Sequence, residues 1–125
     1  MILATILGLG VLGQTALPGD GMGLDEARAK ARLIVVARPV VGLVGSSGPH
    51  FFGTLDLKQS TVWKGDLKKD DLKRVSISGS GAETLPKQGE EYLFFISDYR
   101  DHPNIIKVLL ATPENIGRVT RITSS

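Results

Sequence analysis

The stretch at residues 33–44, LIVVARPVVGLV, constrains the fold of this chain more than any other segment. It is dense in β-branched residues, which favour strands. Pro39 lacks a backbone N–H and belongs at a bulge or on an unpaired sheet edge, and Gly42 adds a second point at which the strand can bend. A long strand with two bends is what a small barrel needs where its sheet turns a corner.

Four more segments with strand character follow at short intervals. In the first of them Leu55 and Leu57 alternate with Asp56 and Lys58, as expected for a half-buried strand. Short connections between strands predict antiparallel pairing, and no repeated strand–helix–strand alternation points to a parallel sheet. We therefore expect a mainly β domain, a five-stranded antiparallel OB-like barrel with a short N-terminal helix, and a small β-sandwich is the alternative. The four segments are residues 51–63, 74–78, 90–97 and 105–112.

The predicted helix precedes the first strand and covers residues 25–32, DEARAKAR. Asp25 is expected to cap it, and Ala27 and Ala31, four residues apart, share one face. At the other end of the chain, apolar residues recur every three positions. That spacing predicts one helical turn or a short strand packed on the barrel, built around Ile116, Val119 and Ile122.

The first residues indicate export. Residues 2–12, ILATILGLGVL, form an uncharged apolar run that is too short for a membrane-spanning helix and fits the core of a signal peptide, although no basic residue precedes it. We expect a signal peptide at 1–16, a flexible leader at 17–24 and one OB-like domain at 25–125. The mature protein is then periplasmic or extracellular, with no membrane span after signal cleavage.

The composition limits the kinds of partner and site that the chain can have. The formal net charge of +2 is smaller than a dedicated nucleic-acid binder usually carries, so no nucleic-acid partner is expected. The chain has no cysteine, which removes disulfides, thiolate metal sites and a cysteine nucleophile. His50 and His102 are the only histidines, and loop residues such as Asp98 and Asp101 are the carboxylates nearest to His102 in sequence. Simple solvent exposure explains them better than a metal site or a nucleophile set with Ser97, so we predict no catalytic site, metal or cofactor.

Three segments in order resemble the netrin-like domain, the barrel of tissue inhibitors of metalloproteinases and of related exported bacterial proteins. They are EARAKARLIVVARPV at 26–40, STVWKG at 60–65 and KQGEEYLFFI at 87–96. In the third, the family's Gly-x-x-Tyr-Leu-x-Phe pattern is matched by Gly89, Tyr92, Leu93 and Phe95. In the second, Trp63 stands where the family usually has leucine.

The resemblance implies an OB-type fold and binding to another protein. In the animal inhibitors it also implies a mature N-terminal cysteine that chelates the protease zinc. This chain has no cysteine, so that inhibitory mechanism is carried over to no residue, and the chain is similar to the cysteine-less exported type.

Adjacent strand residues face opposite sides, so one ring of Phe51 and Phe52 is predicted to enter the core and the other to face outward. Tyr99 lies in a polar loop beside Arg100 and is also expected to be exposed. Aromatic and arginine side chains dominate interface energies, so these four residues are the candidate contact patch of a non-enzymatic, exported binding module whose protein partner is unknown. The alternative is an OB-type domain that binds oligosaccharide or single-stranded nucleic acid on its barrel face.

Overall fold

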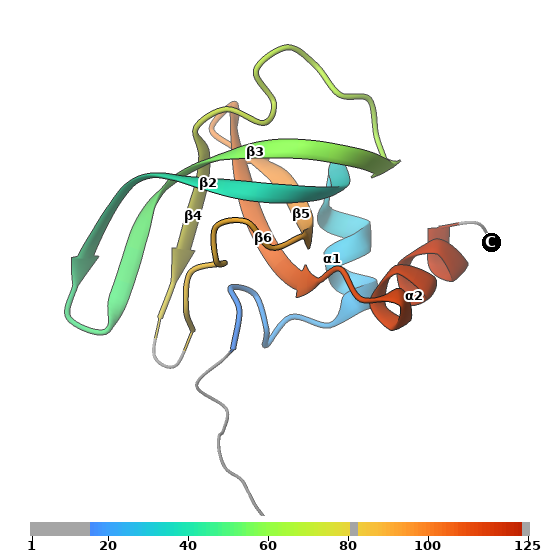
Figure 1. The fold of residues 1–125 in the computed structure, drawn as a ribbon, viewed down its shortest axis with the longest axis horizontal. Coiled ribbons are helices and arrows are strands. Elements are labelled where there is room, and N and C mark those ends of the chain that lie inside the picture. The colour runs from blue at the N-terminus through green and yellow to red at the C-terminus, as the bar shows by residue number, and fades with distance from the viewer. Residues whose placement is uncertain (1–15, 81–82, 124–125) are drawn as a thin grey trace, which may run out of the picture.

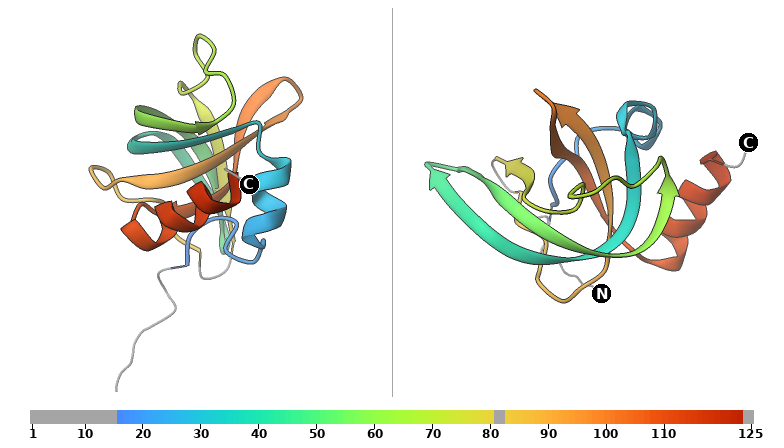
Figure 2. Two further views of the ribbon diagram at one scale, coloured as in Figure 1. Left: turned by 90° about the vertical axis from the view of Figure 1, so that its right-hand side faces the viewer. Right: turned by 90° about the horizontal axis from the view of Figure 1, so that it is seen from above.

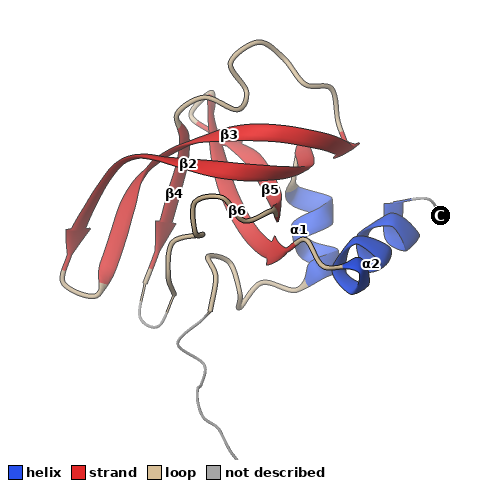
Figure 3. Ribbon diagram, viewed as in Figure 1, coloured by secondary structure: helices blue, strands red, loops and turns tan. Residues whose placement is uncertain are grey.

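The computed structural model describes residues 16–80 and 83–123 (Figure 1). Strands outweigh helices in these residues, so the mainly β prediction is confirmed (Figure 3). The predicted short N-terminal helix is present, and a second helix follows the last strand. The elements are α1 (Leu24–Lys30), β2 (Leu33–Ser47), β3 (His50–Lys64), β4 (Val75–Gly79), β5 (Tyr92–Tyr99), β6 (His102–Leu110) and α2 (Pro113–Thr123).

The strands form one sheet that closes on itself in the order β2-β3-β4-β6-β5. The prediction of purely antiparallel pairing is wrong, because β4 and β6 run parallel and meet at Ser76 and Asn104. The cause is the long connection between β4 and β5. It carries the chain across one end of the sheet, so that β5 pairs with β2 and the antiparallel β5–β6 hairpin then brings β6 beside β4.

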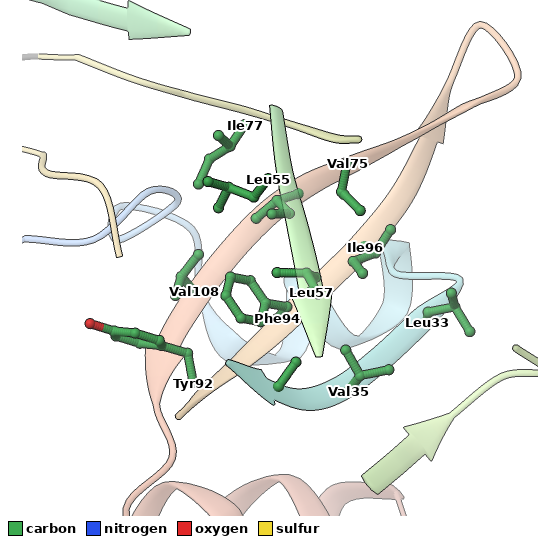
Figure 4. Close-up of a cluster of buried hydrophobic side chains, with 12 residues drawn as sticks. Leu33, Val35, Leu55, Leu57, Val75, Ile77, Tyr92, Phe94, Ile96 and Val108 are labelled. Atoms are coloured by element: carbon green, nitrogen blue, oxygen red, sulfur yellow. The ribbon is translucent and has the colours of Figure 1, made fainter. Parts of the chain in front are cut away.

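One face of every strand contributes to a buried cluster inside the closed sheet, here called the inner cluster (Figure 4). Within it the rings of Tyr92 and Phe94 meet edge to face, with centroids 5.9 Å apart. Because apolar residues alternate along the strands, the inward-facing side chains form one contiguous core. Its members are Leu33, Val35, Ala37, Leu55, Leu57, Val75, Ile77, Tyr92, Phe94, Ile96, Ile105 and Val108.

The opposite faces of β2 and β5 are buried as well, in a second group of side chains to which both helices contribute. Trp63, near the end of β3, packs against this second group, the outer cluster. Burial on both faces explains why residues 33–37 and 92–96 read as continuous apolar runs. The outer cluster consists of Ala27, Ala31, Ile34, Val36, Leu93, Phe95 and Val119.

The residue that caps α1 is not the one predicted. Gly23, not Asp25, is the N-cap of α1, and Asp25 lies in the first turn, where its charge still favours the helix dipole. Lys64 donates hydrogen bonds to the carbonyls of Arg28 (2.6 Å) and Ala31 (2.7 Å) at the other end of α1. α2 is longer than the single turn expected, and the Thr112 hydroxyl caps it by accepting the Asn115 N–H. Neither helix is long and apolar enough to span a membrane among the residues that the structure describes.

The segment expected to be a flexible leader, 17–24, packs on β6 and runs into α1. The N–H of Val108 donates to the Pro18 carbonyl at 2.9 Å. The buried Lys107 ammonium donates to the carbonyls of Gly19 (3.1 Å) and Met22 (2.7 Å), and Leu17 packs against the inner cluster. This segment is therefore part of the fold, because three of its carbonyl groups accept hydrogen bonds from β6 and one apolar side chain packs on the core. The predicted signal peptide, 1–16, lies outside the described residues except for Ala16.

Candidate functional site

The two neighbouring phenylalanines face opposite sides of β3, as strand geometry predicts. Phe51 is half-buried and packs against the inner cluster, close to Gly79. Phe52 is 55% exposed, and its ring lies over Gly45 on the adjacent strand. Of this pair, Phe52 is therefore the side chain that another molecule can reach.

Tyr99 and Arg100 lie at the turn between β5 and β6. Tyr99 is 63% exposed, and the Arg100 guanidinium carbon is 5.3 Å from the centre of its ring, within the range of a cation–π contact. Stacking on the ring restrains the arginine without burying either group. The turn thus presents an aromatic and a cationic group together.

The four candidate residues do not form the single patch expected from the sequence. Phe52 pairs with Ser78, near the end of β4. The β5–β6 turn lies by the start of that strand, because a ring nitrogen of His102 is hydrogen-bonded to the Arg74 carbonyl at 2.8 Å. Figure 1 shows the β2–β3 hairpin tip and the β5–β6 turn in different parts of the molecule. They are two separate surfaces.

The turn borders a polar hollow of about 480 Å³ at one end of the sheet. Its other wall is the connection between β3 and β4. We call the residues that line this hollow, together with Tyr99 and Arg100, the rim. The hollow is lined by Lys69, Asp70, Asp71, Lys73, Arg74, Asp101, His102 and Pro103.

Backbone strain gathers at the rim. The non-glycine residues with positive φ in the described part of the chain are Asp70 (67°), Arg74 (51°), Arg100 (53°) and Asp101 (63°), and all four belong to it. The conformation costs each arginine about 1–2 kcal/mol and each aspartate less, because a short polar side chain tolerates it better. Two successive positive values make the Arg100–Asp101 turn a tight hairpin of the type that prefers Asn-Gly. The sequence has Arg-Asp there instead, and the long arginine is the residue that fits this turn least well.

An ion-pair network holds the rim's walls together. Arg32, just before β2, donates to both carboxylate oxygens of Asp98 at 2.8 and 3.0 Å and to Asp71 at 3.1 and 3.3 Å. The pKa of Arg32 is raised above its ordinary value, chiefly by its hydrogen bonds to Asp98 and then by those to Asp71. Burial alone would raise the pKa of Asp71, but hydrogen bonds from Arg32 and from the Lys68 N–H outweigh it and lower the value. The β3–β4 connection is thereby fixed to the end of β5.

The residues considered for a metal or a nucleophile set are engaged elsewhere. His50 begins β3 at the hairpin tip, whereas His102 is at the rim. Asp98 is bound by Arg32, and Ser97 pairs along the strand with Asn104. Within residues 16–80 and 83–123, no group of three or more histidine and carboxylate side chains is placed to hold a metal ion.

A second exposed surface is the outer part of the β2–β3 hairpin. One extra residue on β2 forms a bulge between Val41 and Val44. The bulge needs Gly53 on the facing strand, because a Cβ there would lie 2.2 Å from the Leu43 carbonyl oxygen. Its effect is to leave Leu43 83% exposed beside Phe52, above a shallow hollow of about 330 Å³. Sequence reasoning noted the bend at Gly42 but not the leucine that it exposes.

Sequence reasoning also missed most of the rim. The run KGDLKKDDLK at 64–73 has the alternating charges of an ordinary solvated turn. The run contains three aspartates, any of which tolerates a left-handed conformation, so it does not single out Asp70, and nothing marks Arg74 just after it, because arginine rarely has a positive φ. The sequence matches no protein-family model, and no curated protein matches it significantly.

Proposed function

We propose that this chain is a non-enzymatic, exported binding module that contacts a partner protein through the rim. The observation that carries the proposal is the concentration of non-glycine residues with positive φ at that one end, Asp70, Arg74, Arg100 and Asp101. Strain that the rest of the fold has to offset is concentrated in proteins at sites of function. The apolar run at 2–12 supports export.

The side chains of the rim suit recognition of a protein. Tyr99 is largely exposed and already carries Arg100 against its ring, so both enter an interface with little further loss of freedom. Tyrosine and arginine are the residue types most enriched among interface hot spots. Lys69 and Arg74 on the opposite wall and Asp101 in the turn itself add charges of both signs around the hollow. Such a mixture favours a partner with complementary charges rather than an anionic polymer.

The proposal includes an OB-type, netrin-like barrel as its scaffold. Support comes from the closed strand order and from the helix that leads directly into the first strand. It also comes from the Lys64-Gly65 pair, which belongs to one of the three segments that carry the resemblance. Lys64 binds the end of α1, and Gly65, at φ 87°, lies so close to the Arg32 carbonyl that a Cβ would be 2.1 Å from its oxygen. The Lys64-Gly65 pair therefore connects α1, the residue just before β2, and the end of β3.

The test replaces the strained turn by its preferred sequence. In the double variant Arg100→Asn, Asp101→Gly, we expect the unfolding free energy to rise by about 1 kcal/mol, because Asn-Gly adopts this turn without strain. Capture of the partner should fall, because the cation beside Tyr99 is gone. Proteins retained from the exported fraction by immobilised wild type are identified first, and their affinities for wild type and variant are then measured.

Tyr99→Ser is the second variant, and each true anchor should cost the complex about 1–3 kcal/mol. Phe52→Ser is the matched control, since it removes a similarly exposed ring from the other surface. A stabilised Asn-Gly variant that binds the partner as tightly as wild type would refute the rim as the binding surface. Loss of binding in Phe52→Ser alone would move the site to the hairpin.

A further inference from the structure

The β2–β3 hairpin carries a surface that shares no residue with the rim. From Pro39 to Leu55 the chain contains no Asp, Glu, Lys or Arg, although these residues make up 22% of the sequence. Four large apolar side chains are exposed there, Leu43 at 83%, Phe52 at 55%, Val44 at 38% and Val40 at 37%, and the exposed polar ring of His50 lies at the hairpin tip. Contiguous apolar side chains on an otherwise charged protein mark a contact surface.

The outer edge of β2 has no strand beside it in this region. β5 pairs with β2 only along Leu33–Ala37. Beyond that point β2 pairs with β3 alone among the described residues, and Figures 1 and 2 show its second half as the outermost strand of a protruding hairpin. Its backbone groups on that side face outward, ready to pair with another strand.

Monomeric proteins usually protect such an edge with lysine, proline or a bulge. Here Pro39 and the bulge at Gly42 and Leu43 interrupt the first part of the edge only. The last four residues, Val44–Ser47, pair regularly with β3 and carry neither a charge nor a proline. Gly45, Ser46 and Ser47 are small, so a second backbone can approach closely.

We propose that this edge pairs with the same edge of a second copy of the chain, to form a two-fold dimer through Val44–Ser47. An antiparallel strand edge is complementary to itself about a two-fold axis. Two uncharged hairpins meet without like-charge repulsion, whereas a charged partner segment finds no countercharge there. Leu43, next to the paired segment, and Phe52, whose ring lies over Gly45, become buried against the second copy.

Sedimentation equilibrium from low to high micromolar concentration tests the dimer. Wild type should shift from monomer to dimer, and Leu43→Lys should raise the dissociation constant at least about tenfold, because it places a charge at the edge of an apolar contact. Leu67→Lys is the matched control, since Leu67 is an exposed leucine outside the hairpin, at 41%. Circular dichroism and thermal unfolding confirm that both variants fold.

A cross-linking experiment locates the contact. The chain has no cysteine, so Ser47→Cys introduces a single thiol, and a short bismaleimide should link two copies. The same reagent should leave Gln88→Cys, on the β4–β5 connection, largely monomeric. A wild type that stays monomeric at every concentration overturns the proposal, and so does a dimer that Leu43→Lys and Leu67→Lys weaken equally. Neither result bears on the rim, which Leu43→Lys leaves intact.

Discussion

The two halves of β2 differ more than any other pair of neighbouring regions in the protein. Residues 33–37 are buried on both faces, between the inner cluster and the helices, and are paired with strands on both edges. The second half, from Val40 onward, pairs with β3 alone and exposes Leu43. Hydropathy hardly distinguishes the halves, since LIVVA and VVGLV are equally apolar. The surroundings, rather than local composition, decide which apolar residues form the core.

If the two halves of β2 differ in this way, the largest loss of stability is expected when a ring is removed from the outer cluster. Phe95 is fully buried between β5 and the helices, and Phe95→Ala should lower the unfolding free energy by about 3–5 kcal/mol. Phe52→Ala, which removes the same group from the exposed hairpin, should change it by about 0.5 kcal/mol or less. Urea unfolding at a concentration low enough to avoid association measures both. Equal losses would show that the hairpin is as tightly packed as the first half of β2.

A smaller effect is expected at the bulge in the second half of β2. Gly53→Ala places a Cβ against the Leu43 backbone, so the bulge must shift, at a cost of about 2–3 kcal/mol. Gly48→Ala, at the hairpin tip, meets open space and should cost only about 1 kcal/mol, through its positive φ. Chemical unfolding of the two variants gives the comparison. A Gly53→Ala variant as stable as Gly48→Ala would mean that the bulge yields easily.

The sequence predicted the strands well because their alternation is local. All five were placed within a few residues, and Ala27 and Ala31, predicted to share one face of the helix, are both buried. It did not predict the parallel contact between β4 and β6, which depends on how the β4–β5 connection crosses the sheet. Nor did it predict that residues 17–22 pack on β6, because Pro and Gly in that segment also fit a flexible leader.

Candidate site residues were predicted less completely, again for a physical reason. Exposure of Phe52 and Tyr99 follows from strand alternation and loop polarity. Their separation on two surfaces depends on the three-dimensional path of β4, which no local pattern encodes. The left-handed conformation of Arg100 runs against the preference of arginine, so the sequence points away from it, although Asp101 tolerates its own positive φ.

The smallest effect concerns charge, which also distinguishes the two ends of β2. Its beginning is fixed by Arg32, bound to Asp71 and Asp98, whereas its far half contains no formal charge. The pKa of Asp71 is lowered below its ordinary 3.8 in the folded protein, because its hydrogen bonds outweigh its burial. A carboxyl group with a lowered folded pKa stabilises the fold above its unfolded pKa, and this stability is lost as the pH falls through the folded value. Acid should therefore weaken the rim and the beginning of β2 before the hairpin.

At neutral pH, Asp71→Asn should lower the unfolding free energy by about 1–2 kcal/mol, because the charged hydrogen bonds from Arg32 are weakened. The deficit should shrink as the pH is lowered from 5 to below 3.8, since wild type then loses the same charge. Asp66→Asn is the control, an exposed position in the same connection. Urea unfolding at a series of pH values measures the difference, and amide exchange shows where the opening occurs. If the Asp71→Asn deficit stays constant across that range, the residue acts through shape and neutral hydrogen bonds. The beginning of β2 would then be held by packing alone, and charge would not separate its two halves.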